Sequence, residues 1–157
     1  MRRLLLAILV TGIGLLVYKL IVDRHAFTFE ERTRNINTAM APKPIGPYNQ
    51  AVRAGSTLYI SGQIALSRGD NPILLNSTIE EETRQVMFNI KSILDEAGLG
   101  FNNIVKTTIY VTDLKDFAAV NKVYGTYFDG NYPARETVQV DSLPKGARVE
   151  ISAIAAN

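Results

Sequence analysis

Along residues 48–157, hydrophobic positions recur with two different periods, and these periods predict both strands and helices. The strand period is clearest near the C-terminus, where apolar residues from Val149 to Ala155 alternate with polar ones. A turn at Ala54-Gly55 predicts a hairpin between two of the earlier strands. The predicted strands cover about residues 51–53, 58–61, 104–112, 137–140 and 148–155.

Two other segments carry apolar residues at helical spacing. The first runs over about residues 79–97, where Thr78 and Glu81 fit a capping box at the helix start. The second follows Asp113, a residue that caps helix N-termini well, and stops near Gly130. The sequence therefore predicts two helices set between the strands.

The predicted elements follow the order ββαβαββ. This order favours an α+β layer, with one sheet and both helices on one of its faces. The other face would be left open, although several of its residues are apolar. An open apolar face indicates a partner, most simply other copies of the same chain.

A long apolar run, residues 4–22, precedes this pattern. At 1.5 Å per residue it spans about 28 Å, close to the thickness of a bilayer core. We therefore predict a transmembrane helix that anchors the chain in a membrane, with Lys19 reaching the interface near its end. Arg2 and Arg3 favour a cytoplasmic N-terminus, which puts the globular part on the non-cytoplasmic side.

A cleaved signal segment is the alternative interpretation of residues 1–22, because the uninterrupted apolar stretch also fits a signal peptide. Residues 23–38 are charged and mixed, which is typical of a tether. Three prolines between residues 42 and 47 then impose extended or turn geometry. We place the globular domain at residues 39–157.

The composition excludes several kinds of chemistry. The chain has no Cys and a single His, His25, which lies beside the apolar run. A thiol nucleophile, a disulfide framework and a Cys/His zinc site are therefore excluded, and no metal or cofactor is expected. Residues 1–34 carry a net charge of +3 and the remaining residues −1. Because a near-neutral domain binds a phosphate backbone poorly, no nucleic-acid partner is expected.

Arg135 and Glu150 are the candidate chemical groups, since each lies in one of two neighbouring strand-like stretches. An arginine is a planar, two-pronged clamp for a carboxylate ligand. A glutamate beside such a clamp can hold a water molecule or accept its proton.

Six short motifs occur in order along the chain: Ile45-Gly46-Pro47-Tyr48, Leu58 to Gln63, Ile104 to Thr108, Asp116 to Asn121, Pro133-Ala134-Arg135, and Leu143-Pro144 through Ile151. With these motifs together, the chain resembles the Rid family of reactive enamine/imine deaminases, also called the YjgF family. The resemblance covers about residues 39–157. It implies a chorismate-mutase-like fold that assembles as a homotrimer, with active sites in the clefts between subunits. It also implies hydrolysis of 2-imino acids to 2-keto acids and ammonia.

The resemblance also implies roles for individual residues. The carboxylate-binding arginine of the family falls on Arg135, and its water-positioning glutamate falls on Glu150. Many members carry Cys two residues after the arginine, where this chain has Thr137, which can still donate a hydrogen bond. The other substrate-binding positions of the family fall on Tyr48, Ser61, Gly62 and Asn121.

Two other functions stay open at this point. One is the ribonuclease or translation-inhibitor activity that has been attached to the family, although the charge of the domain and the lack of a usable His count against it. The other is a non-catalytic trimer that binds small carboxylates. Glu150 separates this last alternative from imine hydrolysis, because carboxylate binding alone does not require it.

Overall fold

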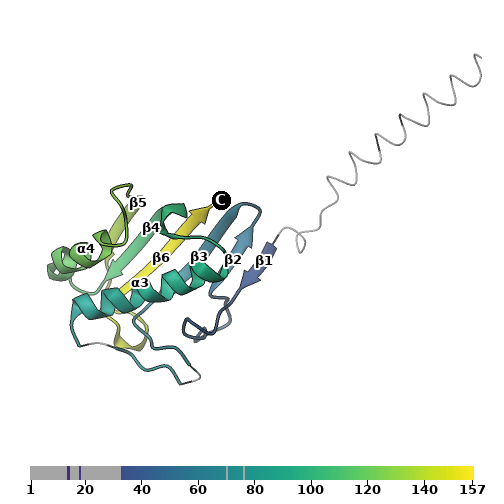
Figure 1. Ribbon diagram of the computed structural model, residues 1–157. Helices are drawn as coiled ribbons and strands as arrows, with labels where there is room; N and C mark the ends of the chain where they lie inside the picture. Colours follow the sequence, from purple (N-terminus) through teal and green to yellow (C-terminus); the bar gives the residue numbers. More distant parts are fainter. Residues whose placement is uncertain (1–13, 15–17, 19–32, 70, 76) are drawn as a thin grey trace, which may run out of the picture. The chain divides into compact units, whose positions relative to one another are not determined.

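A computed structural model of the protein describes residues 14, 18, 33–69, 71–75 and 77–157 (Figure 1). Residues Arg34–Asn157 form one compact unit. Its sheet has six strands in the order β1-β2-β3-β6-β4-β5. The strands are β1 (Thr33–Ile36), β2 (Ala51–Ala54), β3 (Thr57–Gln63), β4 (Ile104–Val111), β5 (Ala134–Gln139) and β6 (Val149–Ala156), and the two longer helices are α3 (Ile79–Glu96) and α4 (Phe117–Gly125).

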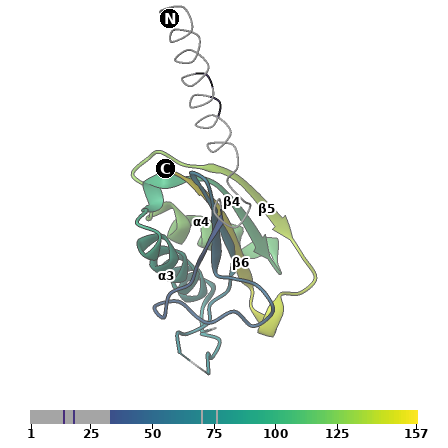
Figure 2. The same ribbon diagram turned by 90° about the vertical axis from the view of Figure 1, so that its right-hand side faces the viewer.

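Both helices cover the same face of the sheet, as the two views of the ribbon show (Figures 1 and 2). The alternation predicted for the C-terminal strand is present in β6, where every second residue from Val149 to Ala155 is buried. These side chains pack under α3 and α4 with fully buried residues such as Leu58 and Ile109. The predicted α+β layer with two helices on one face is therefore confirmed.

Helix α3 begins where the capping pattern predicts. The side chain of Thr78 accepts a hydrogen bond from the backbone N–H of Glu81 at 3.2 Å, which satisfies one of the free donors of the first turn. Three glutamates in that turn also stabilise the helix, because their negative charges lie at the positive end of its dipole. One of them, Glu82, is buried and bonds the Arg148 side chain at 2.7 Å and its backbone N–H at 3.0 Å. This pair ties α3 to the start of β6.

Strand β1 lies within residues 23–38, the segment predicted to be a tether. Its last residue, Ile36, is only 3% exposed and belongs to the hydrophobic core. The buried side chain of Gln50 holds the loop that follows, because its amide N–H groups donate to the backbone carbonyls of Thr38 and Pro42 at 3.0 and 2.8 Å. The compact unit therefore starts before residue 39. The sequence does not predict this earlier start, because β1 is short and mostly polar and shows no strand pattern.

The predicted transmembrane helix is wrong, and so is the membrane-anchored location that followed from it. Within the described part of the chain, no helix is both long enough and apolar enough to cross a membrane. The apolar run 4–22 that motivated the prediction lies outside the described residues, except for Gly14 and Tyr18. Length and hydropathy indicate only that a segment could span a bilayer. Other apolar segments, such as signal peptides and buried core helices, can have a similar length and hydropathy.

Candidate active site

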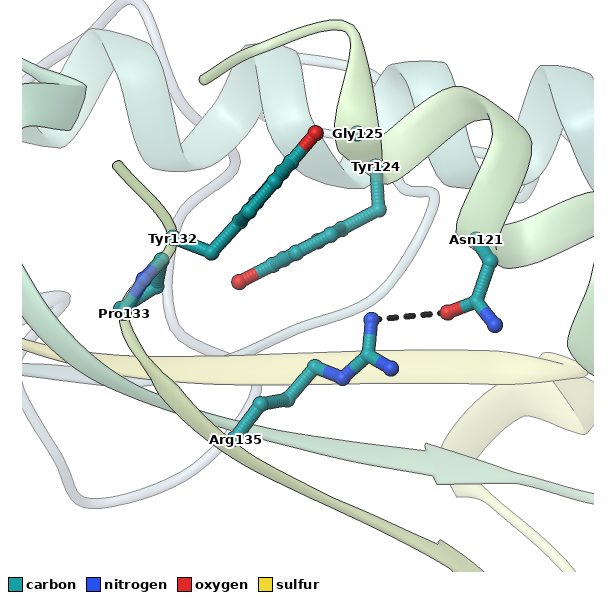
Figure 3. Close-up of a pocket in the computed structure, with 6 residues that line it drawn as sticks. All are labelled: Asn121, Tyr124, Gly125, Tyr132, Pro133 and Arg135. Atoms are coloured by element: carbon teal, nitrogen blue, oxygen red, sulfur yellow. Dashed lines mark hydrogen bonds between the residues drawn. The ribbon is translucent and has the colours of Figure 1, made fainter. Parts of the chain in front are cut away.

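One pocket, of about 420 Å³, lies between α4 and the start of β5 (Figure 3). Arg135 reaches into it from the second position of β5, and its Nη1 donates a hydrogen bond to Oδ1 of Asn121 at 2.7 Å. The pocket therefore brings together two of the predicted site residues, Arg135 and Asn121. Its lining consists of Asn121, Tyr124, Gly125, Tyr132, Pro133 and Arg135.

A second pocket, of about 300 Å³, brings together four other predicted site residues. The hydroxyl oxygen of Tyr48 accepts a hydrogen bond from the backbone N–H of Ile45 at 3.2 Å, so its own proton remains available to a ligand. The Ser61 hydroxyl donates to the carbonyl of Asn49 at 2.7 Å, so its oxygen can accept from a ligand. The lining consists of Ile45, Tyr48, Ser61, Gly62, Ile64, Pro144 and Glu150.

Glu150 lies directly against Gly62 in this second pocket. A Cβ atom added to Gly62 would overlap the Glu150 carboxylate, so only glycine leaves room for it there. Burial raises the pKa of the Glu150 carboxyl, because a partly desolvated carboxylate is less stable in its charged form. A raised pKa makes the carboxylate a stronger proton acceptor, which favours a role as general base.

Strand pairing places Arg135 on the helix-covered face of the sheet. Thr107 of β4 is the direct partner of Arg135 in β5, and residues directly opposite each other share a face. The Thr107 hydroxyl is buried and lies 2.9 Å from the hydroxyl of Tyr124 on α4, so this face is the one beneath the helices.

The same reasoning places Glu150 on the open face. Its neighbours Val149 and Ile151 are fully buried against the helices, and successive side chains of a strand point to opposite faces. A single chain therefore holds Arg135 and Glu150 on opposite sides of its sheet, in two separate pockets. The two candidate chemical groups do not meet within one chain.

Thr137 lies on the helix-covered face, two residues after Arg135. Its partner in β4 is Ile109, a fully buried core residue. The hydroxyl oxygen of Thr137 is buried and has no hydrogen-bond partner among the described residues. It does not line either pocket, so the structure places Thr137 beside the arginine half of the site and not in it.

With this geometry in view, the chain can be compared with known proteins. Residues 38–157 match the family described as Endoribonuclease L-PSP. The chain belongs to this family. It is 48% identical over 120 residues to the 2-iminobutanoate/2-iminopropanoate deaminase of Mus musculus, an alignment that covers 76% of this chain and 88% of that protein.

Solved structures of similar proteins agree with the fold. The Rid-family protein YyfA of Yersinia pestis has a TM-score of 0.76 and 46% identity, covering 80% of this chain and 99% of that one. TdcF of E. coli, solved with bound serine, has a TM-score of 0.71 and 41% identity, covering 79% and 98%. The resemblance to the Rid family is therefore confirmed.

Sequence reasoning missed the aromatic side chains around Arg135. The guanidinium carbon lies 5.2 Å from the ring centre of Tyr124 and 5.8 Å from that of Phe117. Tyr132 lines the same pocket and is exposed. The signal was present in the chain, because residues 117, 121 and 124 have the i, i+4, i+7 spacing of one helix face, but such a stripe is more often core.

Proposed function

We propose that the chain is a hydrolytic deaminase that converts reactive 2-imino acids, such as 2-iminobutanoate and 2-iminopropanoate, to 2-keto acids and ammonia. Relatives of that name are 48% identical to it over most of its length, which supports the assignment. The structural observation that carries it is the presence of two pockets, one holding an arginine without an ion-pair partner among the described residues and the other a partly buried glutamate. The deaminase unit comprises residues 39–157, preceded by β1.

The active site forms between two copies of the chain, in a homotrimer. The support is that Arg135 and Glu150 lie on opposite faces of the sheet, so that only a neighbouring subunit can complete either pocket. The open face also exposes large apolar side chains, including Tyr59 and Val138, which contact between copies would bury. Each cleft then combines the arginine half of one subunit with the glutamate half of the next.

The reaction needs few groups. Arg135 grips the carboxylate of the substrate through paired, charge-assisted hydrogen bonds and so places the imine carbon. Glu150 orients a water molecule and accepts its proton as the water oxygen bonds to the imine carbon. Glu150 then passes that proton to the nitrogen, and the C–N bond breaks as the new hydroxyl gives up its remaining proton to Glu150 and becomes the carbonyl, so that the keto acid and ammonia leave. Imines already hydrolyse in water, so positioning and one proton acceptor suffice, without a metal or cofactor.

The remaining predicted residues act in binding. Tyr48 donates a hydrogen bond to the substrate, and Ser61 of the same pocket accepts one from it. Asn121 holds Arg135. Thr137 is the exception, because its buried hydroxyl lies beside the arginine half and lines neither pocket. The serine bound to E. coli TdcF is an amino acid with an α-carboxylate, which supports a site for that group.

A coupled assay tests the function. An amino-acid dehydratase or oxidase generates 2-iminobutanoate or 2-iminopropanoate, and semicarbazide competes for the free imine. The purified chain should lower semicarbazone formation in proportion to its concentration, whereas the Glu150→Gln variant should not. A chain that binds keto acids but leaves semicarbazone formation unchanged would be the non-catalytic carboxylate binder. Cleavage of RNA by the same preparation, retained in Glu150→Gln, would support the ribonuclease alternative that the family description names.

A further inference from the structure

We propose that Phe117, Asn121 and Tyr124 form a cradle that fixes the orientation of the Arg135 guanidinium before substrate binds. Phe117 and Tyr124 act in it as positioning residues, since their contact is with Arg135. The effect of the cradle on catalysis rests on the proposed function. The ordering of Arg135 by its neighbours can be measured independently of any activity.

The three residues of the cradle lie on one stripe of α4, at i, i+4 and i+7. Asn121 accepts a hydrogen bond from Nη1 of Arg135 at 2.7 Å. The rings of Phe117 and Tyr124 lie 5.8 and 5.2 Å from the guanidinium carbon, within the range of cation–π attraction. Figure 3 shows the guanidinium between the side chains of Asn121 and Tyr124.

A buried hydrogen bond holds the Tyr124 ring in its place. The hydroxyl groups of Tyr124 and Thr107 are 2.9 Å apart, and the two residues are 2% and 1% exposed. Phe128 packs against the same ring, with 4.8 Å between ring centres. Thr107 is also the strand partner of Arg135. The Tyr124 side of the cradle is therefore supported by core residues, and of the three cradle residues Asn121 and Tyr124 line the pocket.

The cradle holds Arg135 without neutralising it. Among the described residues, no carboxylate forms an ion pair with Arg135, and its neighbour Glu136 instead pairs with Lys106 at 3.2 Å. An amide oxygen and two ring faces attract a cation but carry no net charge. Asn121 uses one N–H of the guanidinium, so the remaining donors stay available for the substrate carboxylate.

An arginine that is already ordered loses less conformational freedom when it binds an anion. Removing one ring should therefore weaken binding of substrate and product, with a smaller change in kcat. We expect Phe117→Leu to raise the KM for the imine, and the Kd for pyruvate as a carboxylate probe, by about tenfold. Phe117 is 40% exposed, so this change should leave the fold intact. Phe88→Leu is the matched control, because Phe88 is 43% exposed on α3 and lies in another surface region.

The decisive readout is side-chain NMR of the Arg135 guanidinium in the full-length chain, assigned with Arg135→Lys. Slow rotation about the Cζ–N bonds is expected in the parent chain and in Phe88→Leu, and fast rotation in Phe117→Leu and Asn121→Ala. Tyr124→Phe should loosen the guanidinium less, because the ring remains while the bond to Thr107 is lost.

The NMR result also separates this inference from the proposed function. If imine hydrolysis fails but rotation changes as expected, the cradle stands and the deaminase assignment falls. If Phe117→Leu matches Phe88→Leu in guanidinium rotation and in pyruvate affinity, the cradle is wrong, whatever the activity. Loss of thermal stability in Phe117→Leu with unchanged rotation would likewise assign Phe117 a purely structural role and overturn the proposal.

Discussion

The two halves of the candidate site are built in opposite ways. Arg135 is surrounded by side chains that hold it, namely an amide and two aromatic rings on α4. The carboxylate of Glu150 makes no hydrogen bond or ion pair with any described residue and owes its position to the missing side chain of Gly62 and to burial. Contacts with other side chains hold Arg135, whereas Glu150 occupies room that the absent side chain of Gly62 leaves for it.

This difference matches the tasks that we propose for the two groups. A clamp must present a fixed geometry to a carboxylate, which requires neighbours that restrain the side chain. A proton acceptor must instead be free to bond a water molecule, and it accepts a proton more readily when partial burial without a cationic partner raises its pKa. The following changes should affect the two halves differently.

Glu150→Gln should have the largest effect, a loss of about 10²–10⁴-fold in kcat, because it removes the proton acceptor and keeps its shape. The Kd for pyruvate, measured by calorimetry, should change little, since the clamp is intact. An equal loss in catalysis and in pyruvate binding would contradict the division of labour and assign Glu150 a structural role.

Arg135→Lys should lower kcat/KM by about 10–100-fold, although the charge is kept, because an ammonium cannot make the planar two-bond grip. Unlike Glu150→Gln, this change should weaken pyruvate binding in parallel with catalysis. Steady-state kinetics beside calorimetry measures both. Near-normal turnover in Arg135→Lys would rule out the clamp.

Gly62→Ala should lower kcat by about tenfold or more, because the new methyl group displaces the Glu150 carboxylate. A flexible side-chain end can move aside, so the melting temperature should fall only slightly. Gly100→Ala is a matched control, since a Cβ atom there meets nothing within 4 Å and its φ is not positive. If Gly62→Ala keeps the activity of Gly100→Ala, the space at residue 62 is irrelevant to Glu150.

The smallest expected effect concerns pH. Because burial raises the pKa of Glu150, its active ionised form is lost as the pH falls, at a higher pH than for an exposed glutamate. The acid limb of kcat/KM should therefore have a midpoint above the ordinary glutamate value. In Gly62→Ala, where the carboxylate is pushed toward solvent, the midpoint should move down. A limb that persists unchanged in Glu150→Gln would belong to another group.

Sequence patterns predicted the frame of the molecule well, because its signals are local. The capping residues of α3 and the strict alternation of β6 lie within a few positions of each other. The face of Glu150 could even be read from that alternation. By contrast, β5 is an edge strand that is exposed along most of its length, so its pattern does not reveal which face carries Arg135.

The rest of the site depends on contacts between distant parts of the chain. The space that Gly62 leaves is filled by a residue of another strand, and no local rule connects residues 62 and 150. The membrane helix shows the converse error, since it was predicted from local hydropathy alone. The family resemblance names the site residues as one set, but only the strand register shows that they separate into two faces.

Subunit complementation tests most directly the central claim that one active site needs two chains. Arg135→Lys and Glu150→Gln chains, each much less active than the parent, are purified with different tags, unfolded together in equal amounts and refolded. Random assembly should pair an intact arginine half with an intact glutamate half at about a quarter of the clefts, and so restore about a quarter of the parent activity in the coupled assay. Activity no greater than the average of the two separately refolded variants would contradict the account.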